Sequence, residues 1–443
     1  MNHVIMLSVP GLRQADLAHM PRLSQLAAGG ETAALKASFP ALTWPVQANM
    51  LTGKCASEHG VIANGFYWRD KHEVEMWTAW NDKILAPQIW DLLHQHDPAL
   101  TSAVWFPMLS KGCGADYICM PKPVHNPDGS ESLWCYTRPE DLYGPLRDKY
   151  GHFPLKHFWG PLANIQSTQW ICDSAQYAAE QFKPRFFYLY LPHLDYAAQK
   201  LGPDSPAAQQ AVVDLDAVIG KLVDNFTQIY GTAAHITWLV ASEYVITPVD
   251  HVTYPNRVLR EAGLLQVKDD GGGGELIDFE ASQAWALADH QLSHIFVKDF
   301  DFHLADKVAA LFRGQPGIDE VLVGDQQAKY RVQHERSGEA ILISTPNSWQ
   351  AYYYWLDDAQ APKFARTVDI HQKPGYDPVE LHLDMATKSI PLDATLVKGS
   401  HGAPVKTDAQ RGVLIASRPG VLGGDLLEDW DVCGIVLKQF GIE

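Results

Sequence analysis

The sequence predicts an α/β fold, with a mostly parallel central sheet that helices cover on both faces. Short, continuous apolar runs of strand length recur along the chain, and stretches of helical character separate them. Five such runs lie at residues 4–9, 102–105, 186–191, 236–240 and 413–416. Strands that are buried on both faces read as unbroken apolar runs, and helical crossovers between them favour parallel pairing. With 443 residues, of which 46% are apolar, the chain can bury a large core.

The first helical crossover can be followed residue by residue. Pro21 suits the first turn of a helix, where a missing backbone N–H is not needed, and Leu23 and Leu26 recur on one side. Gly29 and Gly30 favour the end of this helix. The segment therefore predicts a helix that packs against the sheet directly after the first strand.

Two stretches interrupt this alternation and set the predicted domain organisation. Residues 64–161 are rich in Trp, Tyr, Phe and Pro, which indicates a lobe or long loops over one end of the sheet. Residues 247–392 contain four successive glycines, typical of a flexible loop, and strand-like patterns at 340–343 and 352–355. The predicted units are a catalytic core at 1–246 and 393–443, which includes the aromatic-rich lobe at about 64–161, and an inserted α+β cap at 247–392.

The composition excludes several classes of partner. A formal net charge of −17 argues against binding along a nucleic-acid backbone, which requires a basic face. No stretch reaches the ~20 apolar residues of a membrane span, and the first residues lack the basic lead of a signal peptide. The six cysteines show no CxxC pair and no zinc-ribbon spacing, so we expect reduced thiols and a cytoplasmic protein. A small anionic substrate is compatible with this charge, because local donors can oppose the overall field.

Polar residues follow two of the predicted strands, where α/β sheets place their ligands. His193 and Asp195 come after the third apolar run, and Glu243 and Tyr244 come after the fourth. His401 lies in a glycine-flanked loop before the fifth run. Because parallel strands end at the same edge of a sheet, we expect these side chains to gather there. Loop carboxylates mostly cap turns, so a purely structural role for the two acids is the alternative.

Thr43 is the candidate nucleophile. It lies where the extended segment from Phe39 turns into a short helix, for which Pro45 suits the first position and Gly53 a left-handed stop. Backbone N–H groups and the helix dipole at such a start favour an alkoxide or a bound anion. Most threonines at helix starts are only caps, so the catalytic interpretation depends on the neighbouring site residues.

A set of short motifs occurs in a fixed order along the chain, around the Thr43 turn and beyond it. They are Pro10-Gly11-Leu12-Arg13, Met20 to Leu26, Met50-Leu51-Thr52-Gly53, Ser57-Glu58-His59-Gly60-Val61, Asp195 through Gly202-Pro203-Asp204-Ser205, Ser242-Glu243-Tyr244 and Gly399-Ser400-His401-Gly402. In these motifs the chain resembles the nucleotide pyrophosphatase/phosphodiesterase family, the type I phosphodiesterases of the alkaline phosphatase superfamily. It is similar to bacterial members with a segment like 369–378. The resemblance implies an alkaline-phosphatase-like core.

In that family, two zinc ions activate a threonine or serine and stabilise the phosphoryl oxygens, as a two-metal clamp on an in-line displacement. The resemblance maps the nucleophile onto Thr43. It maps one carboxylate and the last histidine of the first zinc site onto Asp195 and His401. Other family ligands and contacts are replaced. These replacements are Gln199 for a histidine, Pro10 for the strand-one aspartate, Glu243-Tyr244 for an aspartate–histidine pair and Val46 for a substrate-orienting asparagine.

These replacements reduce the number of metal ions that the site is expected to hold. Thr43, Glu243 and Tyr244 cannot hold a second zinc well, so the family's two-zinc site is not expected. One divalent ion, with zinc the first choice, is conceivable on Asp195, Glu243 and His401, because two carboxylates and an imidazole suit such ions. His193 is the candidate for an additional or replacing ligand.

A metal-free site is the alternative. Thr43 would then need activation by a neighbouring base and by the helix start. His401 or Glu243 is the candidate base, and Tyr244 or Lys373 is the candidate donor to an oxyanion. Tyr244 as an ordinary core phenol is an equally simple interpretation.

Four residues are candidates for substrate binding. They are Trp44, Gln199, His371 and Lys373. Burial alone would also explain the tryptophan. The histidine and the lysine precede the turn at Pro374-Gly375, so a surface loop is the alternative for both. The aromatic stripe at 352–355 favours core packing over a platform for stacking bases.

Three functional classes follow from these residues. The first is a hydrolase or transferase that acts on a phosphate ester, phosphodiester or related small anion through Thr43. The second is an enzyme that reuses the pocket for other chemistry, and the third is a non-catalytic binder of a small ligand. A hydroxyl, two carboxylates and an imidazole are retained, although a random loss of catalytic residues would not spare them. We therefore expect an enzyme with an altered metal site. The sequence identifies neither the substrate nor the oligomeric state.

Overall fold

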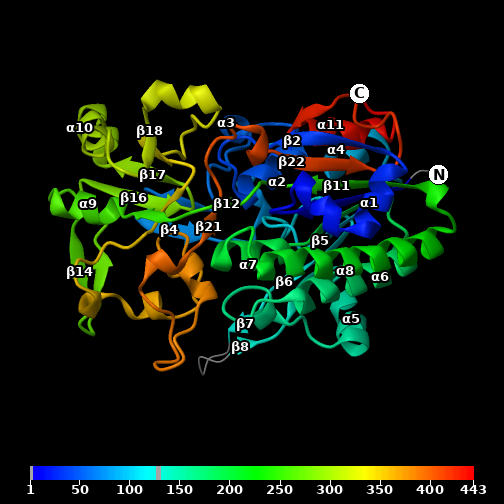
Figure 1. Ribbon diagram of the computed structural model, residues 1–443, viewed down its shortest axis with the longest axis horizontal. Coiled ribbons are helices and arrows are strands. Elements are labelled where there is room, and N and C mark those ends of the chain that lie inside the picture. The colour runs from blue at the N-terminus through cyan, green and yellow to red at the C-terminus, as the bar shows by residue number, and fades with distance from the viewer. Residues whose placement is uncertain (1–2, 126–130) are drawn as a thin grey trace.

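The computed structural model describes residues 3–125 and 131–443, and it confirms the predicted α/β class. Nine strands form the central sheet. They are β1 (His3–Val9), β2 (Glu31–Lys36), β5 (Ser102–Trp105), β6 (Tyr117–Pro121), β9 (Cys135–Arg138), β10 (Phe186–Tyr190), β11 (Ile236–Ser242), β22 (Gly412–Ala416) and β23 (Leu426–Glu428). Their order is β23-β2-β22-β11-β1-β10-β5-β6-β9 (Figure 1). All five predicted apolar runs are therefore strands of one sheet.

The pairing is parallel in the middle of the sheet and mixed at its sides. β11, β1, β10, β5 and β6 run parallel, whereas β22 is antiparallel to both β11 and β2, and β9 is antiparallel to β6. The run at 413–416 is thus an antiparallel strand, although its unbroken apolar pattern predicted a parallel one. An apolar run reports burial on both faces, and burial alone does not fix strand direction.

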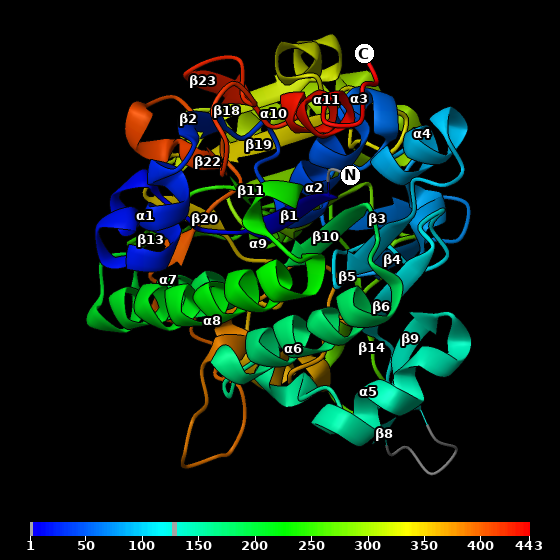
Figure 2. The same cartoon turned by 90° about the vertical axis from the view of Figure 1, so that its right-hand side faces the viewer.

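Successive side chains of β1 point to opposite faces of the sheet, and both faces are covered by helices. Ile5, Leu7 and Val9 belong to one apolar cluster, and Val4 and Met6 belong to the other. Figure 2 shows helices on both sides of the sheet. The first face packs against α1 (Pro21–Ala28), α6 (Ile165–Phe182) and α8 (Pro206–Tyr230), and the second against α2 (Thr43–Thr52), α4 (Ile89–His96) and α11 (Asp431–Lys438).

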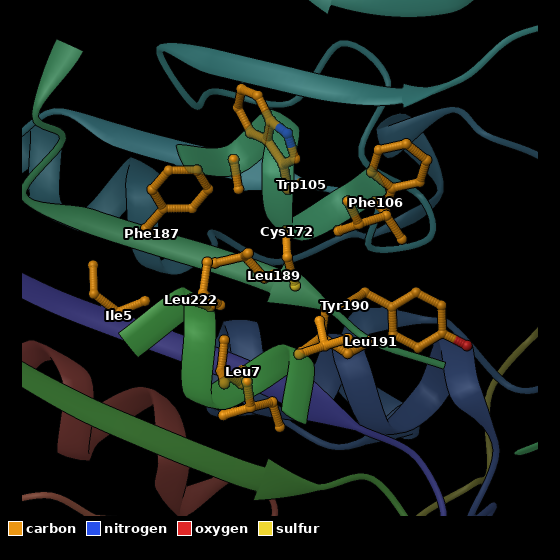
Figure 3. Close-up of a cluster of buried hydrophobic side chains, with 14 of the residues drawn as sticks. Ile5, Leu7, Trp105, Phe106, Cys172, Phe187, Leu189, Tyr190, Leu191 and Leu222 are labelled. Carbon is orange, nitrogen blue, oxygen red and sulfur yellow. The ribbon is translucent and has the colours of Figure 1, made fainter. Parts of the chain in front are cut away.

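The first cluster shows how tightly the strands and helices interlock. Figure 3 shows Leu7 of β1, Leu189 of β10 and Trp105 of β5 in one buried cluster with the helix residues Cys172 and Leu222. All five side chains are buried. Burial of one such aliphatic side chain stabilises a fold by about 1.5–3 kcal/mol, so this layer fixes the sheet that positions the site.

Two predicted helix boundaries can be compared with the structure. α1 begins at Pro21 and is followed by Gly29, as predicted. α2 begins at Thr43, so Pro45 is its third residue and the prediction that it opens the helix is wrong. Proline is tolerated there because the first turn of a helix leaves its N–H groups without intrahelical partners. Gly53 ends α2 at a φ of 68°, in the left-handed region, as predicted.

The inserted region carries a second sheet of four antiparallel strands. These are β16 (Ala284–Asp289), β17 (Leu292–Val297), β18 (Ile318–Val323) and β19 (Ala340–Ser344), in the order β16-β17-β19-β18. The helices α9 (Pro255–Glu261) and α10 (Phe302–Phe312) belong to the same region. The strand predicted at 340–343 is β19. The four glycines at 271–274 lie in the turn between β14 (Val267–Asp269) and β15 (Glu275–Ile277).

The strand-like pattern at 352–355 is not a strand, which corrects the prediction. Its backbone carbonyls bond to side chains of α9 instead of to a neighbouring strand. Asn256 donates to the Tyr352 carbonyl at 3.1 Å, and Arg257 donates to the Trp355 carbonyl at 2.8 Å. The aromatic side chains of the segment are buried in the core of the inserted region, in agreement with the core interpretation.

Shorter elements complete the description. They are β3 (Gly65–Trp68), β4 (Glu73–Met76), β7 (Val124–His125), β8 (Glu131–Ser132), β12 (Thr247–Pro248), β13 (His251–Thr253), β20 (Ser348–Gln350), β21 (Gly399–Ser400), α3 (Ala56–His59), α5 (Tyr143–Tyr150) and α7 (His193–Leu201). Among the described residues, no helix is long and apolar enough to cross a membrane.

The sheet brings three chain segments to one place. β1 lies between β10 and β11, and Ser8 near its end pairs in register with Tyr190 and Ala241. The chain leaves β10 into α7 and leaves β11 at Glu243. The residues after these parallel strands therefore meet at the same edge of the sheet, which is the usual ligand position in such folds.

Candidate active site

Thr43 is the first residue of α2 and only 4% of its surface is exposed. Its hydroxyl oxygen lies 3.0 Å from the hydroxyl oxygen of Tyr244, which follows β11. The next backbone N–H, that of Trp44, donates to the side-chain oxygen of Asn64 at 3.0 Å. Asn64 therefore holds the backbone at the start of α2, and the Thr43 hydroxyl lies against the Tyr244 hydroxyl.

Tyr244 links Thr43 to Asp195 on α7. Its hydroxyl donates to the Asp195 carboxylate, with 3.2 Å to Oδ2 and 3.4 Å to Oδ1. An ionised carboxylate only accepts hydrogen bonds, so the Thr43 hydroxyl must then donate to the Tyr244 oxygen. Burial raises the pKa of Asp195 to about 7, although the hydrogen bond from Tyr244 opposes this shift. We name these three residues, Thr43, Tyr244 and Asp195, the hydroxyl relay.

Glu243 lies beside the relay and is bonded on one oxygen only. Its Oε1 accepts from the Ser8 hydroxyl at 2.6 Å and from the Gln47 amide at 2.8 Å. Its Oε2 has no hydrogen-bond partner among the described residues. Burial raises the pKa of Glu243 to about 8, the two hydrogen bonds oppose the shift, and the charge of Asp195 adds to it. The carboxyl group thus keeps one free oxygen at the edge of the sheet.

His401 packs flat against Tyr244. The two ring centroids are 3.5 Å apart and the planes differ by 7°. Nδ1 of His401 lies 2.8 Å from the Ala41 carbonyl, so this nitrogen carries the proton and Nε2 presents a lone pair. That Nε2 is buried and has no partner within residues 3–125 and 131–443. Burial lowers the pKa of His401 well below its usual value.

The structure adds residues that the sequence analysis did not single out. Asn64, Asp289, His290 and Tyr376 all contact the predicted site. Asp289 accepts from the Asn64 backbone at 2.7 Å, and it bonds Nδ1 of His290 at 2.6 Å. The His290 ring stacks on Tyr376 at 3.6 Å and lies 4.0 Å from the His401 ring. The sequence signals were a polar Asp-His-Gln interruption between two apolar strands and, for Tyr376, its place in the segment 369–378.

Two of the predicted substrate-binding residues lie at this site. Gln199 accepts from the Tyr376 hydroxyl at 2.6 Å, and its amide nitrogen has no partner among the described residues. Trp44 is 1% exposed and packs against Phe66 and Trp77, with centroid distances of 5.7 and 5.8 Å. The tryptophan therefore belongs to a small aromatic cluster beside the start of α2.

The other two lie away from the relay. His371 is exposed, and its ring nitrogen lies 3.2 Å from the Met76 carbonyl. Lys373 is 1% exposed, and its ammonium group bonds Asp377 at 2.8 Å, Glu380 at 2.6 Å and the Thr367 carbonyl at 2.9 Å. All three ammonium donors are thereby used, so Lys373 has none left for an oxyanion.

His193 lies on the other side of α7 from the relay. It lines a pocket of about 260 Å³ together with Lys200, Asp214 and Leu381. Neither ring nitrogen has a hydrogen-bond partner within the described part of the chain. Asp195, two residues later on the helix, bonds Tyr244 instead. His193 therefore faces the pocket, whereas Asp195 faces the hydroxyl relay.

These residues do not fit a zinc centre. Pro10 offers no side-chain ligand, and the Tyr244 hydroxyl lies between Thr43 and Asp195, hydrogen-bonded to both. Glu243 is bonded to a hydroxyl and an amide. In the described ranges no three or more His, Cys, Asp or Glu side chains form a group that could hold a metal ion. The set Asp195, Glu243, His401 and His193 is therefore not assembled as a set of metal ligands in the described part of the chain.

The fold is an α/β fold with a parallel sheet centre, and polar residues gather at one edge of that sheet. Residues 4–377 match the family described as type I phosphodiesterase / nucleotide pyrophosphatase, and the chain belongs to this family. An uncharacterised pyrophosphatase/phosphodiesterase of Schizosaccharomyces pombe is 24% identical over 273 residues. That match covers 58% of this chain and 46% of the yeast protein, so the chain spans about half the length of this relative.

Two solved structures show the same fold. Phosphonoacetate hydrolase from Sinorhizobium meliloti, in complex with phosphonoformate, has a TM-score of 0.64 at 16% identity, over 99% of this chain and 95% of that chain. Murine ectonucleotide pyrophosphatase/phosphodiesterase 5, as an inactive variant in complex with AMP, has a TM-score of 0.63 at 13% identity. That match covers 100% of this chain and 96% of the murine one.

Proposed function

We propose that the protein is an enzyme that cleaves or transfers the phosphoryl or phosphonyl group of a small anion, with Thr43 as the nucleophile. The observation that supports this proposal is the hydroxyl relay, in which the Thr43 hydroxyl is 3.0 Å from Tyr244 and Tyr244 is 3.2 Å from Asp195. A nucleophilic hydroxyl is weak at its ordinary pKa and needs a route for its proton. The relay provides that route from residues of the chain itself.

The chemical steps balance within this arrangement. The Thr43 oxygen forms a bond to phosphorus while the bond from phosphorus to the leaving group breaks. The Thr43 proton passes to Tyr244, whose own proton passes to Asp195. Water then attacks phosphorus while the bond to the Thr43 oxygen breaks, and Asp195 returns its proton through Tyr244 to that oxygen. The leaving group departs as an anion, and the proton that it takes up equals the one that the attacking water loses. A positioned acid–base group of this kind contributes about 10²–10⁴-fold to a rate.

The substrate class rests on the relatives. The family is described by phosphodiester and pyrophosphate cleavage, and the two solved relatives were crystallised with phosphonoformate and with AMP. A small phosphorylated or phosphonate anion is therefore the first class to test. We propose the inserted residues 247–392 as the region that recognises it, because His290 at their tip lies against His401, which stacks on Tyr244 of the relay. The six buried cysteines are free thiols, which supports our proposal of a cytoplasmic location.

The experiment compares Thr43→Ala with Thr43→Ser. A chromogenic phosphodiester, a nucleotide and phosphonoacetate serve as probes, with and without a chelator. We expect the alanine variant to lose at least about 10³-fold in kcat and the serine variant to keep measurable turnover, because serine retains the hydroxyl. We expect the chelator to change the rate little, since no step depends on a metal. Full activity of Thr43→Ala would overturn the nucleophile assignment, and activity that disappears with chelator and returns with zinc would overturn the metal-free mechanism.

A second candidate function is binding of a small ligand without turnover. The observation that favours it is the enclosure of the site, since Thr43, Tyr244, Asp195, Glu243 and His401 are each less than 8% exposed. Thermal unfolding of the Thr43→Ala variant separates the two functions. A probe that raises Tm but is never turned over by the wild type supports the binder, whereas product formation by the wild type supports the enzyme.

A further inference from the structure

The tip of the β16–β17 hairpin reaches from the inserted region into the Thr43 site. Asp289 pairs in register with Leu292, so only His290 and Gln291 form the turn. His290 has a φ of 58°, in the left-handed region. A two-residue hairpin turn with positive φ at its first central position favours glycine there. A buried histidine at this position costs backbone energy, and such strain is concentrated at functional sites.

The side chain of His290 has specific contacts that a glycine could not make. Its Nδ1 lies 2.6 Å from the Asp289 carboxylate, which only accepts hydrogen bonds when ionised. The proton of the neutral ring is therefore on Nδ1, and Nε2 carries the lone pair. The ring packs between Tyr376, at 3.6 Å and 12°, and His401, at 4.0 Å and 44°.

These contacts continue to Thr43 along two separate routes. On one side, the rings follow one another from His290 to His401 to Tyr244, whose hydroxyl bonds Thr43. On the other side, Asp289 accepts from both the backbone and the side-chain amide of Asn64, at 2.7 and 3.1 Å. Asn64 then accepts from the backbone N–H that follows Thr43. The two routes start at adjacent residues and end at the same helix start.

The backbone of the hairpin tip also holds the loop that carries His401. The Gln291 N–H donates to the His401 carbonyl at 3.0 Å. A Cβ atom added at Gly402 would lie 3.0 Å from Leu42, 3.3 Å from the Gln291 nitrogen and 3.5 Å from the His290 Cβ. The hairpin tip, the His401 loop and the residue before Thr43 therefore meet with no space for a further side chain.

We propose that Asp289 and His290 are positioning residues for Thr43. The carboxylate fixes the tautomer and orientation of the His290 ring, the ring holds His401 and Tyr244 in their stack, and the stack sets the direction of the Thr43 hydroxyl. A carboxylate that orients an imidazole in this way is a recurring device of active sites. The effect on turnover rests on the proposed function, whereas the tautomer of His290 does not.

The activity test separates the ring nitrogens from simple packing. His290→Phe keeps a flat ring in the stack but removes the bond to Asp289, and Asp289→Asn keeps the volume but changes the tautomer. We expect both variants to lose about 10–100-fold in kcat on the chromogenic phosphodiester, with KM changed less than about twofold. His290→Gly, which suits the turn, should fold with an unchanged or higher Tm and show the same loss. Wild-type kcat in His290→Phe would overturn the proposal, because packing alone would then explain the residue.

A matched control and a second readout complete the test. His294 is a buried histidine in the next strand that bonds the Ile62 carbonyl at 3.1 Å and lies outside the stack. His294→Phe should lower Tm and leave kcat of the folded enzyme unchanged. Nitrogen-15 NMR of the histidine rings should show the Nδ1–H tautomer for His290 in the wild type and its loss in Asp289→Asn. An Nε2–H tautomer in the wild type would overturn the proposal even if the enzyme turned over no probe.

Discussion

Two buried clusters of acidic side chains differ in how completely their hydrogen bonds are satisfied. In the first, the ammonium group of Lys373 bonds Asp377, Glu380 and a carbonyl, and the second oxygen of Glu380 accepts from Trp159. In the second, at the hydroxyl relay, no Lys or Arg within the described residues bonds Asp195 or Glu243. One oxygen of Glu243 is left free there, and so is Nε2 of His401.

The difference indicates different roles for the two clusters. A buried polar atom without a partner costs about 1–3 kcal/mol, so a fold that keeps several together at one sheet edge retains them for something other than stability. The Lys373 cluster fixes the segment that carries Tyr376 to the site. The relay cluster keeps free acceptors where a ligand can use them. Four experiments test this difference between the two clusters.

Lys373→Met should give the largest change. It leaves the Asp377 and Glu380 carboxylates buried without their cation, and we expect the free energy of unfolding to fall by about 3–5 kcal/mol. Chemical denaturation monitored by fluorescence measures this change. Lys71→Met, at an exposed lysine, is the matched control and should change stability by less than about 0.5 kcal/mol. Equal stabilities of the two variants would show that the Lys373 cluster is not structural.

Tyr244→Phe tests the relay itself. The phenylalanine ring can still stack on His401, but it cannot bond Thr43 or Asp195. We expect kcat on a chromogenic phosphodiester to fall about 100-fold, with Tm close to that of the wild type. Tyr353→Phe is the control, because that buried hydroxyl has no partner in the described residues and lies in the inserted core. Unchanged kcat in Tyr244→Phe would remove Tyr244 from the proton route.

Both ring nitrogens of His59 have hydrogen-bond partners, whereas Nε2 of His401 has none among the described residues. The Nε2 of His59 lies 2.7 Å from the Asn49 side chain, its Nδ1 accepts from the Val61 N–H at 3.1 Å, and burial lowers its pKa from 6.5 to about 3. The unfolded chain then binds a proton below pH 6.5 that the folded protein does not. The free energy of unfolding should therefore fall as the pH drops from 6.5 towards 3, by about 2 kcal/mol at pH 5 from this residue.

Denaturation at pH 7 and pH 5 measures that slope. His59→Gln should reduce the loss of stability between pH 7 and pH 5 by about 2 kcal/mol, since glutamine takes up no proton in this range. His303→Gln, at an exposed histidine, should leave the slope as it is in the wild type. A slope in His59→Gln as steep as that of the wild type would assign the acid sensitivity to other groups.

Glu243→Gln should have the smallest effect on stability, under about 1 kcal/mol. The glutamine oxygen can still accept from Ser8 and Gln47, and no ion pair is broken. Glu380→Gln is the matched comparison in the other cluster and should cost about 3 kcal/mol, because it weakens the buried pair with Lys373. If Glu243→Gln proved as costly as Glu380→Gln, the two clusters would not differ in kind.

The sequence alone determined the parts of the protein that local patterns encode. Unbroken apolar runs marked five strands of the central sheet, and the order of the short motifs identified the family. Position after a strand was enough to select Asp195, Glu243 and Tyr244, because parallel strands end at one edge of a sheet. His401 was selected by its glycine-flanked loop. The start of α2 was also marked locally, although the proline was misread as its first residue.

Only the tertiary structure decided how those residues are connected. Asn64 and Asp289 are 225 residues apart, and the stack of His290 on His401 joins an inserted hairpin to a C-terminal loop. No periodicity marks such contacts, because they depend on how the inserted region sits against the central sheet. The two buried partners of Lys373 were likewise hidden, since a lysine beside a proline–glycine turn looks the same in sequence whether it is free or enclosed. Side-chain chemistry and the positions of the buried strands can thus be read along the chain, but satisfaction of hydrogen bonds is a property of the packed molecule.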